Sequence, residues 1–227
     1  MVRSDAVKIV GYQHFLRLAD RIQWDDEAID LTVDAANWPT VADARIKELV
    51  SGFIVGEAGV AEHLHAFFDG DAAATFEAQR VDEERHARFF ARYAQAVGLD
   101  DPRAHVSPEF VDIFERRLPQ AAAQAGVEAV GLYHMVLEGV VFTAGQYALL
   151  EILDKDQLPG LYEGMELVLR DEKWHIGFGT RCLNDAQLSE AQVDAILEEG
   201  ERAAALWAPE QAERVLRTLR RRMAAVR

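Results

Sequence analysis

Two short segments of the sequence repeat one spacing of glutamate and histidine. Glu83 and His86 stand three residues apart in RVDEERHARFF, and Glu172 and His175 repeat this spacing in LVLRDEKWHIGFG. Residues three positions apart lie on the same side of a helix, so each segment presents a carboxylate and an imidazole together. One such pair is common on solvated helices, but two pairs in one chain favour a metal site.

Two further glutamates lie among apolar residues. Glu57 falls on the inward stripe of a helix expected over 41–67, and Glu138 lies in a run that is apolar on nearly all sides. An isolated carboxylate in such a place becomes neutral or takes a partner, because burying its charge is costly. One glutamate from each of two helices, with Glu-x-x-His from each of two others, is the ligand set of a dinuclear site in a four-helix bundle. The predicted metal ligands are Glu57, Glu83, His86, Glu138, Glu172 and His175.

These ligand types suit two metal ions that react with oxygen. Four carboxylates offset most of the charge of two divalent ions and can bridge them, while each imidazole binds one ion and leaves room for oxygen. Carboxylate and imidazole accept both iron and manganese, so a manganese–iron and an iron–iron centre both stay open. The alternative is a metal-free bundle in which the same residues form buried salt bridges.

The rest of the chain has the pattern of helices that would position these residues. Six prolines stand mostly between segments rich in Ala, Glu, Leu and Arg, which is typical of a helical bundle. Strand patterns and fixed repeats are absent from the sequence. We expect an all-α fold, as one domain over residues 1–227, with a four-helix metal-binding core and additional peripheral helices. The expected helices cover 41–67, 71–97, 108–125, 127–154, 157–184, 189–206 and 209–225.

The amino-acid composition indicates which binding partners and which cellular compartment suit this protein. With 24 Lys and Arg against 39 Asp and Glu, the net charge is −15, which argues against binding nucleic acid or an anionic membrane. The single cysteine, Cys182, excludes an internal disulfide and suits a reducing compartment. The N-terminus lacks the apolar run of a signal peptide, and no apolar segment of spanning length is free of polar residues. We therefore expect a soluble, cytoplasmic protein.

The order of the six predicted ligands resembles that of the ribonucleotide reductase small-subunit superfamily, within the wider ferritin-like class. The likeness spans most of the chain, from QWDDEAID at 23–30 through RDEKWHIGFG at 170–179. It implies a ferritin-like helical bundle. Bacterioferritin-like proteins share the ligand order, but the interval between Glu83 and Glu138 has room for the extra helix over 108–125 that the reductase-like proteins contain.

Three segments are similar to the ligand-binding oxidases of that superfamily: WDDEAIDLTVDAANW at 24–38, GEAGV at 56–60 and YHMVLEG at 133–139. Those proteins hold manganese and iron, use O2 and accept a long-chain fatty acid. The resemblance therefore implies a dinuclear metal-dependent oxidase, a homodimer, that binds an apolar small molecule. This chain is shorter than those oxidases and its C-terminal part is compressed, so a fatty-acid pocket is the part of the resemblance with the least support.

The resemblance also implies roles for residues beside the ligands. Tyr133 and Val60 match a tyrosine and a valine that an oxygen-driven reaction joins by an ether cross-link, although Tyr133 also suits an ordinary core position. Asp171 matches a carboxylate that orients a ligand histidine, and the alternative is a solvent-facing residue. Trp24 or Trp38 would lie on the same hydrogen-bonded path. His63, His65 and His134 are interpreted as surface or core residues.

Other functions stay open. A ribonucleotide reductase small subunit would store a radical for a separate catalytic subunit, but Phe90 stands where that subunit usually carries its radical tyrosine. We also see no C-terminal tail with a relay tyrosine. A ferritin-like ferroxidase or iron-storage protein would suit the acidic composition, and a non-catalytic binding bundle is a further alternative.

Overall fold

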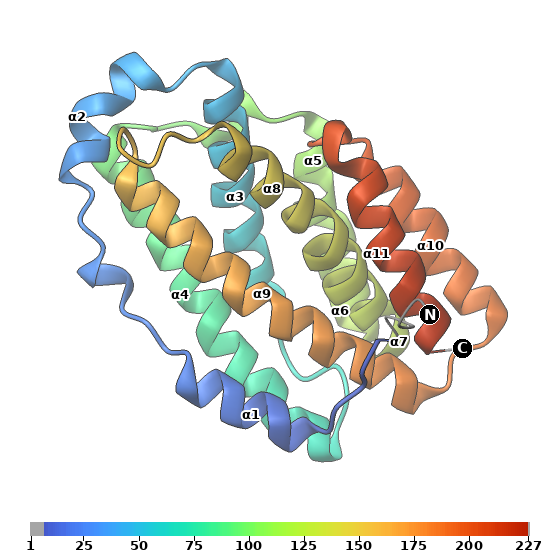
Figure 1. The fold of residues 1–227 in the computed structure, drawn as a ribbon. Helices are drawn as coiled ribbons and strands as arrows, with labels where there is room; N and C mark the ends of the chain where they lie inside the picture. Colours follow the sequence, from blue (N-terminus) through green and yellow to red (C-terminus); the bar gives the residue numbers. More distant parts are fainter. Residues whose placement is uncertain (1–6, 227) are drawn as a thin grey trace, which may run out of the picture.

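The apolar stripes of the sequence form helices that lie side by side as a bundle (Figure 1). The computed structural model describes residues 7–226, and within this range every regular element is helical. The prediction of an all-α, ferritin-like bundle is confirmed. Four long helical runs form its centre: α3 (Ala44–His63), α4 (Ala73–Val97), the run formed by α7 (Gly126–Val130), η5 (Gly131–Phe142) and α8 (Thr143–Ile152), and α9 (Pro159–Ala186).

Local signals in the sequence set the ends of these helices. The side chain of Asp43 accepts a hydrogen bond from the backbone N–H of Ile46 and so caps the start of α3. Gly98 ends α4 in a left-handed conformation with φ of +70°, which glycine adopts without strain. The predicted helix over 41–67 is shorter in the structure because the chain becomes extended at Leu64.

Two stretches that the sequence predicts as plain helices are partly π-helical. Residues 108–124 divide into α5 (Pro108–Asp112), the π-helical η4 (Ile113–Arg117) and α6 (Leu118–Gln124). The run over 126–152 contains the longer π-helical segment η5, which carries both Tyr133 and Glu138. Because π-helical turns are rare and concentrate at functional sites, η5 draws attention to the side chains it presents.

Helices that the sequence analysis did not assign cover the start of the chain. They are α1 (Tyr12–Arg21), η1 (Asp26–Ala28) and α2 (Thr32–Val41). Both α1 and α2 contact α4 and α9 on the outside of the bundle (Figure 1). Asp34 on α2 is fully buried and accepts the backbone N–H groups of Gly160 and Leu161 at 2.9 and 2.8 Å. It therefore satisfies the start of α9, which has no side-chain cap of its own.

The C-terminal helices cover the opposite side of the bundle, against η5 and α8 (Figure 1). They are α10 (Glu190–Ala204) and α11 (Ala212–Ala225), and the short η6 (Pro209–Gln211) precedes α11. Trp207 lies between α3 and α8, where a Cβ atom at Gly52 or Gly145 would stand 2.2 Å from its indole ring. Two short turns, η2 (Gly70–Ala72) and η3 (Pro102–His105), complete the elements.

Among the described residues, one helix is long and apolar enough to cross a membrane, and it contains polar residues such as Glu138, in line with the sequence analysis. It is Gly126–Ile152, and 72% of its most apolar window is buried inside the bundle. Its neighbours α3, α9, α10 and α11 cover it. Burial in the core thus accounts for its apolar composition.

Candidate metal centre

The six residues predicted as metal ligands come together in the middle of the four central helices. Glu57 comes from α3, Glu138 from η5, and one Glu-x-x-His pair each from α4 and α9. All six side chains are buried, with at most 1% exposure. Burial of four carboxylates in a helical core is costly unless a compensating charge is present. The bundle therefore concentrates carboxyl groups at its centre.

The cluster has two halves that share one residue. In the first half, Glu57, Glu83, His86 and Glu172 each offer an atom, and these atoms lie within 4.8 Å of one another. In the second half, Glu83, Glu138 and His175 do the same. Glu83 belongs to both groups, which is the arrangement expected for a carboxylate between two ions.

Both histidines direct Nδ1 toward the carboxylates. Nδ1 of His86 lies 3.5 Å from Glu83 Oε2 and 3.6 Å from both Glu57 Oε2 and Glu172 Oε1. Nδ1 of His175 lies 3.1 Å from Glu83 Oε1 and 3.6 Å from Glu138 Oε1. Each imidazole thus presents a possible ligand nitrogen to its own half of the cluster.

Many polar atoms of the cluster have no hydrogen-bond partner among the described residues. They are Nδ1 of both histidines, both carboxylate oxygens of Glu57 and Glu172, and Oε2 of Glu83 and Glu138. Buried polar atoms are normally satisfied, so such a concentration requires an explanation. Oxygen and imidazole donors facing one another fit two divalent ions such as iron or manganese.

The electrostatics of the cluster also favour a bound cation. Burial raises the pKa of Glu57, and it raises those of Glu138 and Glu172 well above the usual range. Burial opposes charge on His86 and His175 as well, but the neighbouring carboxylates outweigh it and raise the pKa of both histidines. Without metal, protons on these groups compensate the charge. A metal ion would displace them.

Each histidine contacts an aspartate from the opposite helix. Oδ2 of Asp171 lies 3.3 Å from Nε2 of His86, as the role predicted for Asp171 requires. Oδ2 of Asp82 lies 3.4 Å from Nε2 of His175, a contact that the sequence analysis missed. A detectable signal existed, because Asp-Glu-x-x-His occurs at 82–86 and again at 171–175. Both aspartates are fully buried.

A buried hydrogen-bonded network joins the two aspartates. Arg85 is 3% exposed and donates to Asp82 Oδ1 at 2.5 Å and to Asp171 Oδ2 at 3.1 Å. Trp24 donates from Nε1 to Asp171 Oδ2 at 2.7 Å. Burial opposes charge on Asp171, but the bonds from His86 and Trp24 lower its pKa to about 2. Of the two tryptophans considered for this path, Trp24 is therefore the one in contact.

Trp38 lies elsewhere. It is buried against Tyr93, with ring centroids 5.7 Å apart. The three histidines left as surface or core residues also differ from one another: His65 is exposed, His63 is half-buried and His134 is fully buried. Only His134 has a connection to the cluster, and it is indirect.

That connection runs through Gln79, which the sequence analysis did not consider. The amide nitrogen of Gln79 donates to Glu138 Oε1 at 2.6 Å and to Glu83 Oε1 at 3.1 Å. Nε2 of His134 lies 2.9 Å from the amide oxygen of Gln79. Burial lowers the pKa of His134 to about 3, so its imidazole is neutral at pH 7.

Tyr133 and Val60 are both fully buried near the cluster. Val60 lies on α3 one turn after Glu57, and Tyr133 lies on η5 one turn before Glu138. Burial raises the pKa of Tyr133 well above its usual range, and the charges of nearby glutamates, Glu83 first among them, add to this effect. Its hydroxyl is therefore protonated. A cross-link between these two residues stays a prediction.

Solved structures with a similar fold were obtained with a Mn/Fe cofactor. A structure of R2-like ligand-binding oxidase with an aerobically reconstituted Mn/Fe cofactor superposes with a TM-score of 0.73 at 22% identity, covering 95% of this chain and 91% of that one. This chain has the fold of the R2-like ligand-binding oxidases. Two variants of such an oxidase give TM-scores of 0.76 and 0.74, at 21% and 23% identity, and cover 93% and 90% of their own chains and 95% of this one. No known family profile matches the sequence.

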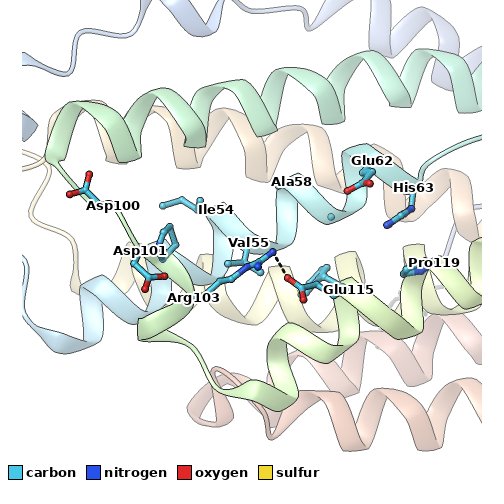
Figure 2. Close-up of a pocket in the computed structure, with 13 residues that line it drawn as sticks. Ile54, Val55, Ala58, Glu62, His63, Asp100, Asp101, Arg103, Glu115 and Pro119 are labelled. Carbon is cyan, nitrogen blue, oxygen red and sulfur yellow. Dashed lines mark ion pairs between the residues drawn. The ribbon is translucent and has the colours of Figure 1, made fainter.

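A surface cavity of about 700 Å³ borders the same helix that carries Glu57 (Figure 2). Ile54, Val55, Ala58 and Gly59 line it from α3, on a different side of the helix from Glu57. None of the six clustered residues lines this cavity. Its polar lining is mostly acidic: Glu62, Asp100, Asp101 and Glu115, the last paired with Arg103.

Proposed function

We propose that this protein is a dinuclear metal-dependent oxidase that activates O2. The observation that carries the proposal is the buried cluster of four glutamates and two histidines, most of whose facing atoms have no hydrogen-bond partner in the described chain. The similar fold of oxidases solved with Mn/Fe cofactors supports a centre of this type. Either manganese with iron or two iron ions would fit the donor set.

The chain's own residues would hold and insulate the two ions. When bound, the metals would supply electrons to O2 and so permit oxidation of a nearby C–H or O–H bond. His86 and His175 would bind through Nδ1, because Asp171 and Asp82 would each accept a hydrogen bond from the Nε2–H and so fix the tautomer. The buried position of the cluster would keep bulk water out.

Tyr133 and Val60 would be the first groups oxidised. Forming an ether between the tyrosine oxygen and the valine removes two hydrogens, which O2 would take up as it is reduced. Phe90, at the position of a radical tyrosine in reductase subunits, stacks on Phe53 with ring centroids 5.4 Å apart and offers no hydroxyl to oxidise. The lack of a hydroxyl at residue 90 favours the oxidase over the reductase alternative.

The substrate would be an apolar small molecule. The acidic lining of the cavity beside α3 would repel the carboxylate of a fatty acid, so a neutral apolar molecule would suit that cavity better. A separate electron donor would supply the reducing equivalents. We further propose a cytoplasmic homodimer without nucleic-acid or membrane partners, in keeping with the net charge of −15.

Oxygen uptake by metal-loaded protein tests the proposal. Protein loaded anaerobically with Fe(II), or with Mn(II) and Fe(II), is mixed with oxygenated buffer while an oxygen electrode and the optical spectrum are followed. We expect uptake by the wild type and none by Glu83→Ala. Glu84→Ala is the matched control, because this neighbour is exposed and contacts Arg80. Full loading with two ions but no oxygen uptake would contradict an oxidase.

The storage alternative predicts a different assembly. A mineral-storing protein would elute from a size-exclusion column as a very large cage and would accumulate many iron atoms per chain. An oxidase should elute as a dimer and stop at two metal ions per chain.

A further inference from the structure

We propose that Gln79 and His134 form a positioning pair that fixes Glu83 and Glu138 and makes the two metal-binding halves of the cluster unequal. The inference rests on the proposed metal centre and concerns two residues outside the ligand set. Both residues are fully buried.

The pair occupies equivalent places on two facing helices. Gln79 stands four residues before Glu83 on α4, and His134 stands four residues before Glu138 on η5. The amide nitrogen of Gln79 reaches across to Oε1 of Glu138 at 2.6 Å and along its own helix to Oε1 of Glu83 at 3.1 Å. An amide nitrogen carries two hydrogens, so both are used.

His134 determines which way the amide of Gln79 faces. We assign the hydrogen of the neutral imidazole to Nε2, and in this tautomer His134 takes the amide oxygen of Gln79 as its partner, 2.9 Å away. If the amide were turned over, its oxygen would face two carboxylates and its N–H groups would face the N–H of His134. The contact with His134 therefore keeps the donating side of Gln79 on the glutamates.

The effect falls on one half of the cluster. In the half that contains Glu138, Oε1 of this residue is occupied by Gln79 and only Oε2 is without a partner. In the other half, both oxygens of Glu57 and of Glu172 are without a partner. A metal ion beside Glu57 and Glu172 would meet carboxylate oxygens that have no other partner. An ion beside Glu138 would share Oε1 with the N–H of Gln79, because a carboxylate oxygen has a second lone pair.

We therefore expect two ions of unequal affinity, with the group that contains Glu57 filled first. The weaker ion depends on Gln79, because its two hydrogen bonds stabilise the charged carboxylates that receive this ion. Replacing Gln79 by Leu leaves these oxygens unpartnered in an apolar core. Changes to groups that hold metal ligands typically weaken metal binding by about 10- to 100-fold.

Anaerobic calorimetric titration of metal-free protein with Mn(II) is the test, with the absorption spectrum of Co(II)-loaded protein as the second readout. Wild type should bind two ions in separate steps. Gln79→Leu should weaken the second step by about 10- to 100-fold and change the Co(II) spectrum, while the first step changes by less than about threefold.

Two further variants separate positioning from packing. His134→Phe should weaken the second step, and His134→Gln, which restores a donor near the position of Nε2, should recover it. Gln146→Leu is the matched control. Gln146 is also fully buried, and its amide atoms have no hydrogen-bond partner in the described chain. Its loss should leave both steps unchanged.

Each outcome bears on a different claim. Equal weakening of both steps by Gln79→Leu, or no weakening at all, would overturn the positioning pair and leave the proposed oxidase standing. Failure of the wild type to bind any metal would overturn the proposed function, and this inference with it. Circular dichroism of each variant establishes that the helices are retained.

Discussion

Asp171 on α9 contacts His86 on α4, with Oδ2 of the aspartate 3.3 Å from Nε2 of the histidine. The reverse contact joins Asp82 on α4 to His175 on α9 at 3.4 Å. Each of these helices thus supplies one Glu-x-x-His pair together with the carboxylate that orients the histidine of the other. Loss of either aspartate therefore affects a residue on the neighbouring helix.

Replacing Asp171 by Asn should weaken metal binding by about 10- to 100-fold. The amide can present an N–H donor to Nε2 of His86, and this favours the tautomer whose hydrogen is on Nδ1, the nitrogen needed for the metal. Asp82→Asn should do the same for the half that contains His175. Metal affinity of the two variants, measured by anaerobic titration, checks this. Asp185→Asn is the control on α9, since Asp185 is exposed and contacts Tyr12. An equal loss in Asp185→Asn would show that the effect is not specific.

Replacing Asp34 by Ala should reduce the free energy of unfolding by about 1–3 kcal/mol, because two backbone N–H groups at the start of α9 lose a buried acceptor. Urea unfolding of metal-free protein measures the change. Asp30→Ala is the comparison, because Asp30 is exposed and accepts a hydrogen bond from the nearby Thr32 N–H. A loss at Asp34 no larger than at Asp30 would count against a capping role.

The metal-free protein should become less stable as the pH rises. The raised pKa values of His86 and His175 mean that the folded state keeps protons that the unfolded state releases above the ordinary histidine value of 6.5. The free energy of unfolding then falls with increasing pH above that value. The pKa values of Asp82 and Asp171 are lowered, so these two carboxyl groups change the free energy of unfolding only at acidic pH.

Thermal unfolding from about pH 6.5 to about pH 9, with and without metal, checks this dependence. Metal-loaded protein should show a smaller fall, because the ions replace the protons on the histidines. A metal-free melting temperature that stays constant or rises over this range would contradict the raised histidine pKa values.

Oxygen exposure of the loaded protein should join Tyr133 to Val60. Peptide mass spectrometry should detect a linked pair lacking two hydrogens, and the pair should be absent from Tyr133→Phe protein treated in the same way. Unmodified Tyr133 in fully loaded, oxygen-exposed wild type would remove this part of the proposed chemistry and leave the metal centre unaffected.

The central cluster could be predicted because its residues violate the hydrophobic pattern. Glu57 and Glu138 stand at positions that the helical period turns inward, and such carboxylates need a partner. The same reasoning does not find Gln79, which is uncharged and therefore less conspicuous in a sequence. It also does not pair Asp82 with His175, because the two residues are on different helices and only their packing brings them together.

The π-helical turns and the N-terminal helices were harder to predict from the sequence, for physical reasons. The π-helical turns of η4 and η5 use the same residue types as α-helices, so their course over 113–117 and 131–142 follows from packing. The N-terminal helices α1 and α2 are short, and α2 contains Pro39, a residue that normally ends a helix pattern.

Metal content measures the central claim most directly. Protein purified from cells supplied with both manganese and iron is analysed for bound metal, beside Glu83→Ala, Glu172→Ala and the exposed control Glu84→Ala, all examined for retained helical content. We predict two metal ions per chain in the wild type and in Glu84→Ala, and their loss in the other two variants. No bound metal in the wild type, even after anaerobic reconstitution with ferrous iron, would contradict the proposed centre.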